Sequence, residues 1–413
     1  MHEPPDVHLP LPRACPFRVP PAFSDLRAAP GLATGKLPGG MLTWLVTRLD
    51  DARAALSAPA FTADRSDPSF PMPQKRPAPA GARRPTVTAA ERRARGRGAS
   101  LIGMDPPDHT VARRAVIGEF TTRRVQLLRP RIQQIVDERI DAILADGPPA
   151  DLVAALSLPV PSQVICELLG VPYAKHEFFQ SRSMMLLSHR VHAEQRFEAL
   201  RELFGFLDEL VSAAETEPGD NLLGRQVTRR TPASDEDHRD LVSLAFLLLV
   251  AGHETTANMI SLGTLAVLND PGRLMSAVTD PDRAPLTVEE MLRYFSIADI
   301  GTGRVALTGT EIGGTQIQDG EGVIISLLAA NHDPAAFPDP DTLDPDRRDR
   351  SHVAFGFGPH QCLGQSLARA ELEIVYGTLF RRIPGLRLAL PLDELPVKDD
   401  AFVYGLHELP VTW

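Results

Sequence analysis

The chain has 413 residues and a net charge of −10, and 43% of its residues are hydrophobic. This composition is ordinary for a globular protein with a large core, and the negative charge disfavours nucleic acid as the main partner. The three cysteines, Cys15, Cys166 and Cys362, are odd in number and far apart, so we expect no disulfide framework and a reducing, cytoplasmic location.

The N-terminal half begins with a Pro-rich lead-in over residues 1–40, without the basic and apolar segments of a signal peptide. Residues 41–47 then predict a short strand, and residues 51–56 predict a helix. Residues 66–103 are rich in Pro, Arg and Ala and are too long for an inert connection, which indicates a functional loop.

The middle of the chain, residues 109–268, reads as mostly helical. Its clearest helix spans 241–268, with Ser234 as the N-cap and Asn269-Asp270-Pro271 as the stop signal. The longest apolar run within it is shorter than the roughly 20 residues that cross a bilayer, so we expect a soluble protein.

Small strands are predicted over residues 304–325 and 401–412, where apolar residues alternate with turn residues. No repeat and no linker between separate cores is visible in the sequence. The sequence therefore predicts one domain over residues 1–413, mainly α-helical with small β-sheets.

A glycine-rich segment, Ala354 to Ile374, leads Cys362 to the start of a predicted helix. Unpaired N–H groups at a helix start favour a thiolate over a thiol. Gly358 and Gly364 would let the backbone pass close to a flat ligand, and Phe355 could keep water from the sulfur. A lone cysteine is more often a buried structural residue, and that alternative is weighed against the motif below.

The loop matches the pattern F-x-x-G-x-x-x-C-x-G in full, and it resembles the haem-ligand loop of the cytochrome P-450 family. Further matches extend the resemblance over nearly the whole chain. They are Ala251-Gly252-His253-Glu254-Thr255 for A-G-x-[DE]-T, Glu290 and Arg293 for E-x-x-R, Arg347, and His109 to Arg113. The chain resembles soluble bacterial members of secondary metabolism, with His332 standing where an arginine is more usual and only a local surface contact in doubt.

The resemblance implies the cytochrome P-450 fold and haem b, with the Cys362 thiolate as the iron ligand and O2 as co-substrate. It makes Glu254 and Thr255 the catalytic pair, in which Thr255 hydrogen-bonds oxygen and Glu254 relays protons from outside. Ala251 and Gly252 would lie against the cofactor, and Gly252 would open space for oxygen. The alternatives are a Thr255 bonded to its own helix and a solvated Glu254 carboxylate.

The haem carboxylates require cations, and the resemblance assigns His109, Arg113, Arg304 and His360 to them. A solvated surface role is the alternative for each. Glu290 and Arg293 could be an ordinary surface pair, but the resemblance makes them a buried structural triad with Arg347.

The resemblance also suggests segments that line a substrate pocket: residues 66–103, 184–187, 247–251, 297–305 and 404–406. The residues singled out there are Met184, Met185, Leu247, Val250, Ile297, Ile300, Tyr404 and Leu406. Arginines and a lysine crowd the first of these segments, namely Lys75, Arg76, Arg83, Arg84, Arg92, Arg93, Arg95 and Arg97. We expect this loop to be a lid over a bulky, mostly apolar natural product of macrolide or polyketide type, which would be hydroxylated.

The sequence carries no dinucleotide fingerprint, flavin segment or iron–sulfur cysteine cluster, so electrons from NAD(P)H would arrive through a separate ferredoxin and its reductase. Basic groups near the Cys362 loop, with Arg369 as the candidate, would receive the ferredoxin. We expect a monomer without a nucleic acid or membrane partner. Two rival functions stay open: a peroxide-driven haem-thiolate enzyme, and a haem sensor or electron carrier without turnover.

Overall fold

The computed structural model describes residues 6–73, 100–188, 190–230, 234–298, 302–398 and 401–413. The chain divides into two compact units that alternate along the sequence. Unit 1 comprises Met1–Val111, Leu292–Leu343 and Asp349–Cys362, and unit 2 comprises Ala112–Met291, Asp344–Arg348 and Leu363–Trp413. That all 413 residues form one domain stays a prediction.

Among the described residues, most regular secondary structure is α-helical, and the strands are short. The helices are α1 (Ala22–Ala28), α2 (Leu49–Ser57), α4 (Asp108–Val116), α5 (Thr122–Asp146), α6 (Pro159–Leu169), α7 (His176–Leu187), α8 (Ala193–Thr216), α9 (Leu222–Arg229), α10 (Asp235–Asn269), α11 (Pro271–Thr279), α12 (Ala284–Phe295), α13 (Leu327–Asn331) and α14 (Gln365–Arg382). The strands are β1 (Asp6–His8), β2 (Ala33–Lys36), β3 (Leu42–Val46), β4 (Phe61–Thr62), β5 (Ala150–Asp151), β6 (Gly303–Ala306), β7 (Thr310–Ile312), β8 (Thr315–Ile317), β9 (Gly322–Ile325), β10 (Arg387–Leu388), β11 (Val397–Lys398), β12 (Gly405–Leu406) and β13 (Pro410–Thr412).

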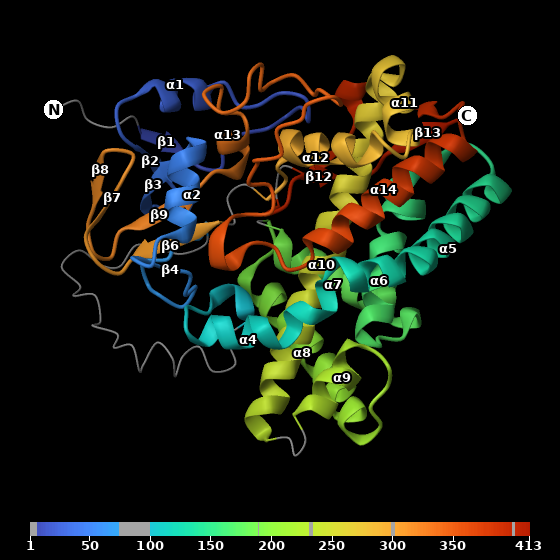
Figure 1. Ribbon diagram of the computed structural model, residues 1–413, viewed down its shortest axis with the longest axis horizontal. Coiled ribbons are helices and arrows are strands. Elements are labelled where there is room, and N and C mark those ends of the chain that lie inside the picture. Colours follow the sequence, from blue (N-terminus) through green and yellow to red (C-terminus); the bar gives the residue numbers. More distant parts are fainter. Residues whose placement is uncertain (1–5, 74–99, 189, 231–233, 299–301, 399–400) are drawn as a thin grey trace. The chain divides into compact units, whose positions relative to one another are not determined.

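Unit 1 is organised around a six-stranded mixed sheet with the order β1-β2-β3-β9-β6-β4, and Figure 1 shows the strands in this sequence. The central strand β9 is buried along its whole length and pairs in parallel with β3, so that Trp44 lies opposite Val323. Such a continuous apolar run is typical of a strand covered on both faces. One core cluster joins α2 to the sheet and a second joins α1 to it, and both include residues of α13 or its start.

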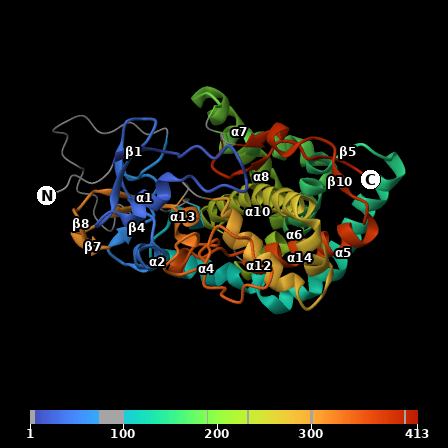
Figure 2. The same cartoon turned by 90° about the horizontal axis from the view of Figure 1, so that it is seen from above.

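Unit 2 is built around α10, which packs against α6, α8 and α14, as Figure 2 shows. Ser234 caps its N-terminus, and Asp237 completes a reciprocal capping box. By length and composition alone α10 could cross a membrane, but 61% of its most apolar window is buried inside the protein. That burial is typical of a central core helix.

Most predicted elements are confirmed: the strand at 41–47 is β3, the helix at 51–56 is α2, and α10 contains the predicted 241–268. Small strands also occur within 304–325 and 401–412. The predicted basic lid falls largely on residues 74–99, including its lysine and arginines, and these lie outside the described residues.

The expectation for His332 is wrong. Its side chain is fully buried, its Nδ1 lies 3.0 Å from the Leu328 carbonyl oxygen, and its ring meets Tyr294 edge-on. Burial lowers the pKa of His332 to about 3, and nearby Arg293 adds to this effect. An uncharged imidazole therefore fills a core position, not a surface contact.

Candidate active site

The cysteine loop in unit 1 folds back on itself between Phe355 and Cys362. The Cys362 N–H donates to the Phe355 carbonyl at 2.8 Å, and this bond sets the end of the loop. Gly356 and Gly358 both have a φ of 71°, the left-handed region that side chains disfavour. A Cβ at Gly358 would also lie 3.0 Å from the Leu56 carbonyl oxygen, so this glycine permits close packing on the end of α2 rather than on a ligand.

The glycine that follows the cysteine, unlike Gly358, is not closely packed. Gly364 precedes α14, and a Cβ built on it would meet nothing within 4 Å. The Cys362 side chain is partly exposed, whereas Cys166 is buried and burial raises its pKa to about 12. Of the three cysteines, Cys362 therefore combines partial exposure with a shaped loop.

A buried network anchors this loop to the rest of unit 1. The Asn331 amide oxygen accepts from the Val353 N–H at 2.8 Å, and its amide nitrogen donates to the Ser296 hydroxyl at 2.7 Å. Ser296 has a φ of 40°, a strained value for a residue with a side chain. The network thus joins the start of the cysteine loop to the residue before Ile297, where the predicted substrate segment begins.

Among the predicted partners of the haem carboxylates, two histidines in unit 1 lie side by side. The rings of His109 and His360 lie 4.2 Å apart, centroid to centroid. Arg304 is buried on β6 and donates to the Gly303 carbonyl at 2.7 Å. Burial lowers the pKa of Arg304 to about 10, and the charge of neighbouring Arg65 lowers it further, although Asp105 opposes both. Arg113 lies one helical turn after His109 on α4 and is partly buried.

Three predicted residues form an open stripe on α10 in unit 2. Leu247, Ala251 and Thr255 lie four residues apart on one face, and none of them is buried, although most of the surrounding helix is. The Thr255 hydroxyl donates to the Ala251 carbonyl at 2.7 Å, so the helix-bonded alternative describes its present geometry. Its oxygen lone pairs stay available as acceptors.

Gly252 does not open space for a small molecule, and that interpretation is wrong. A Cβ at this position would lie 3.1 Å from the Ile165 Cδ1 on α6. The missing side chain instead permits close packing of α10 on α6.

The Glu254 carboxylate is buried, so the solvated alternative is wrong. Its Oε1 accepts from the Lys398 ammonium at 2.7 Å, and the Asn258 amide lies 3.5 Å away. Burial is the largest single influence and would raise the pKa of Glu254, but the charge of Lys398 and the hydrogen bonds from Lys398 and Asn258 act together against it, and the pKa is lowered. The adjacent His253 is also buried, and burial lowers its pKa. Nothing in the sequence predicts this role for Lys398, because an isolated lysine in a short strand gives no local signal.

The E-x-x-R residues take structural positions. Arg347 lies 3.1 Å from Glu290, and both side chains are nearly buried. Arg293, three residues after Glu290 on α12, is fully buried and donates to the carbonyls of Asn331 at 2.7 Å and Thr342 at 3.2 Å. The two bonds from Arg293 hold the backbone at Asn331 and Thr342.

The residues predicted to line the substrate pocket differ in their exposure to solvent. Met184 and Met185, near the end of α7, are 43% and 38% exposed, whereas Tyr404 and Leu406 are buried. Leu247, Val250 and Ile297 are half-buried, and Ile300 lies outside the described residues. Arg369, the predicted docking group, forms a two-pronged ion pair with Glu289, so its charge is already matched.

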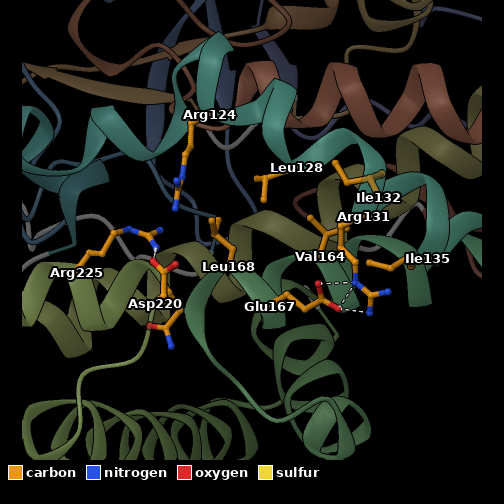
Figure 3. Close-up of a pocket in the computed structure, with 11 residues that line it drawn as sticks. Arg124, Leu128, Arg131, Ile132, Ile135, Val164, Glu167, Leu168, Asp220 and Arg225 are labelled. Carbon is orange, nitrogen blue, oxygen red and sulfur yellow. Dashed lines mark hydrogen bonds and ion pairs between the residues drawn. The ribbon is translucent and has the colours of Figure 1, made fainter.

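A cavity of about 160 Å³ lies within unit 2, and none of the residues named above as site candidates lines it (Figure 3). Its walls come from α5, α6, α9 and the turn before α9. Arg131 faces Glu167 at one end and Arg225 faces Asp220 at the other, so both arginines are paired.

Comparison with known proteins places the chain in a family. Residues 284–403 match the family model for cytochrome P450. The chain is 47% identical to pentalenic acid synthase of Streptomyces avermitilis over 98% of its own length and 97% of that protein's. It is 52% identical to the solved structure of cytochrome P450 MoxA from Nonomuraea recticatena, with 98% of each chain covered and a TM-score of 0.85. The mycinamicin VIII C21 methyl hydroxylase of Micromonospora griseorubida, solved with mycinamicin VIII bound, is 41% identical over 98% of this chain and all of that one, with a TM-score of 0.87. The fold, the cysteine loop and these full-length relatives show that the chain belongs to the cytochrome P450 family of haem-thiolate monooxygenases.

Proposed function

We propose that this monooxygenase hydroxylates a bulky, mostly apolar natural product, with electrons from a ferredoxin and its reductase. The observation that carries the proposal is the open stripe on α10, where Leu247 and Ala251 present apolar surface and Thr255 adds one hydroxyl. An apolar wall with a single polar group suits an apolar molecule that needs only to be oriented.

The residues of unit 1 fit a haem. Cys362 is partly exposed on a loop whose glycines keep side chains away, and Gly364 leaves open space beside it. Arg304 is a buried cation with Arg65 as a charged neighbour, burial lowers the pKa of Arg304, and a bound carboxylate would stabilise its charge. We assign Cys362 as the iron ligand, and His109, Arg113, Arg304 and His360 as partners of the haem carboxylates. Phe355, Ala251 and Gly364 would pack near the ring.

When bound, the haem supplies the iron at which dioxygen is reduced and one oxygen atom passes to the substrate. The protein's part is to deliver protons while excluding water. The Thr255 hydroxyl, held on Ala251, presents its oxygen as an acceptor and can pass on a proton. Glu254, one residue earlier, would take up a proton from outside and pass it on, and its burial limits leakage of water.

The size of the substrate is the least constrained part of the proposal. Exposed Met184 and Met185 give the end of α7 an adaptable apolar surface. Relatives include a mycinamicin VIII C21 methyl hydroxylase, solved with mycinamicin VIII bound, and a vitamin D3 dihydroxylase of Streptomyces griseolus. We place the enzyme in the cytoplasm, where ferredoxins supply electrons.

Titration of macrolide, steroid and small terpene panels, followed by the haem spin state, tests the substrate. Macrolides or steroids should shift the spin state at low concentration, and a response to compact terpenes alone would overturn the large-substrate proposal. Product formation with a ferredoxin system, compared with added peroxide, separates the monooxygenase from a peroxide-driven enzyme.

Proton delivery is tested by coupling, the fraction of reductant that appears in product. Thr255→Ala should still consume reductant but release more of it as peroxide, and Glu254→Gln should slow product formation. Unchanged coupling in both variants would contradict the proposed relay.

A further inference from the structure

A two-stranded hairpin reaches the middle of α10 and brings a buried cation to Glu254. Strands β11 and β12 pair antiparallel, with Lys398 opposite Gly405. The side chains of Lys398 and Glu254 are only 7% and 5% exposed, and their charged atoms lie 2.7 Å apart. Such a pair is shielded from solvent and salt, unlike the surface ion pairs of unit 2.

Asn258 fixes the same contact from one turn further along α10. Its amide oxygen accepts from the Lys398 ammonium at 3.2 Å, while its amide nitrogen faces Glu254. A Cβ at Gly405 would lie 2.1 Å from that amide oxygen, so the absence of a side chain there lets the hairpin approach α10. The lysine is therefore held in one place by both strands of the hairpin.

The hairpin is also tied to the end of α7. Phe402 donates its N–H to the Leu187 carbonyl at 3.0 Å, and Ala401 forms an isolated bridge with Ser188. The segment that carries Met184 and Met185 is thus connected through a few residues to the partner of Glu254.

We propose that Lys398 is the positioning residue for Glu254, and that it holds the carboxylate ionised and turned toward the hairpin. The inference rests on the proposed relay through Glu254. A carboxylate bonded to an ammonium group is a poor proton donor, so separation of the pair raises its proton affinity and lets it take up and pass on a proton. The charged or titratable groups that face Glu254 among the described residues are Lys398 and neutral His253.

The test reads the Glu254 carboxyl directly in the resting haem-loaded enzyme, without turnover. Infrared difference spectra across a pH titration report the protonated carboxyl, and Glu254→Gln identifies its signal. Lys398→Met should raise the pKa of Glu254 by about 1 to 3 units, the effect of losing an adjacent charge. Lys398→Arg should restore the wild-type titration, and Lys175→Met, at an exposed lysine of unit 2, should change nothing.

An identical Glu254 titration in wild type and Lys398→Met would overturn the proposal. If Lys398→Met does not fold, Lys398→Gln, which keeps a neutral hydrogen bond, is read in the same way. The coupling assay separates the two proposals. Uncoupling in Glu254→Gln with an unmoved titration in Lys398→Met refutes only the inference, whereas a moved titration with unchanged coupling in Glu254→Gln refutes only the relay.

Discussion

The cysteine loop and the middle of α10 reach their geometry in different ways. In the loop, the bond from Cys362 to Phe355 and the two left-handed glycines all lie within a few residues of one another. On α10, the carboxylate of Glu254 takes its partner from 144 residues further along the chain. The comparison teaches that a contiguous motif encodes the shape of a ligand loop, whereas the charge state of a buried acid depends on which distant residue packs against it.

Removal of the Cys362 sulfur should abolish the ability of the cysteine loop to bind iron. Cys362→Ala should abolish the red-shifted Soret band of the reduced carbon monoxide complex, because only a thiolate opposite the carbon monoxide gives that band. Cys15→Ala and Cys166→Ala should keep it, since the loop does not depend on them. Retention of the band in Cys362→Ala would disprove the ligand assignment.

Asn331 bonds to Val353 at the cysteine loop, and Asn258 on α10 bonds to Lys398. Both are buried, so replacing each with alanine compares the loop with the middle of α10. Asn331→Ala leaves the Val353 N–H without its partner, while the Ser296 hydroxyl loses one bond but still donates to the Arg293 carbonyl, and the change should cost about 1–3 kcal/mol of stability. It should also weaken the thiolate band, because Val353 starts the cysteine loop. Asn258→Ala should cost a similar free energy of unfolding and leave the band intact. Denaturant titration and the carbon monoxide spectrum measure both, and equal spectral losses would contradict a local anchor.

Glu371 on α14 tests whether the helix after the loop depends on long-range burial. Burial raises the pKa of Glu371 to about 8, so the folded state prefers its neutral form. Its contribution to stability is fully present below the unfolded pKa of about 4.3 and is lost as the pH rises through about 8. Glu371→Gln should remove this decline and, at the highest pH, be more stable than wild type by at least about 1.4 kcal/mol. Parallel pH profiles of the unfolding free energy in both proteins would contradict a buried neutral Glu371.

Ferredoxin docking should give the smallest effect. The Arg53 guanidinium lies 5.8 Å from the centre of the Phe357 ring on the cysteine loop, and its ion pair with Asp50 is long, at 3.8 Å, and involves a carboxylate that is 98% exposed. We therefore expect Arg53 to replace Arg369 as the docking cation. Arg53→Gln should slow reduction about two- to five-fold at low salt, while Arg369→Gln should leave the rate unchanged. Stopped-flow reduction by ferredoxin measures both rates. A rate that does not vary with salt would count against electrostatic docking.

Much of the fold could be predicted because its signals are local. Ser234 and Asp237 mark the start of α10, and the apolar run 322–325 becomes the buried strand β9. His332 shows the limit of such signals. A histidine in a polar stretch reads as a surface residue, but His332 packs against Tyr294 and bonds to the Leu328 carbonyl in the core.

The sequence by itself determined the family, the iron-ligand candidate Cys362 and the proton-relay candidates Glu254 and Thr255, since each lies in a contiguous motif. Only the tertiary structure decided that Gly252 serves helix packing, that Arg369 is already paired, and that Glu254 is buried beside Lys398. The reason is physical. Backbone conformation and helix periodicity act over a few residues, whereas burial and charge pairing depend on residues that meet only after the chain has folded.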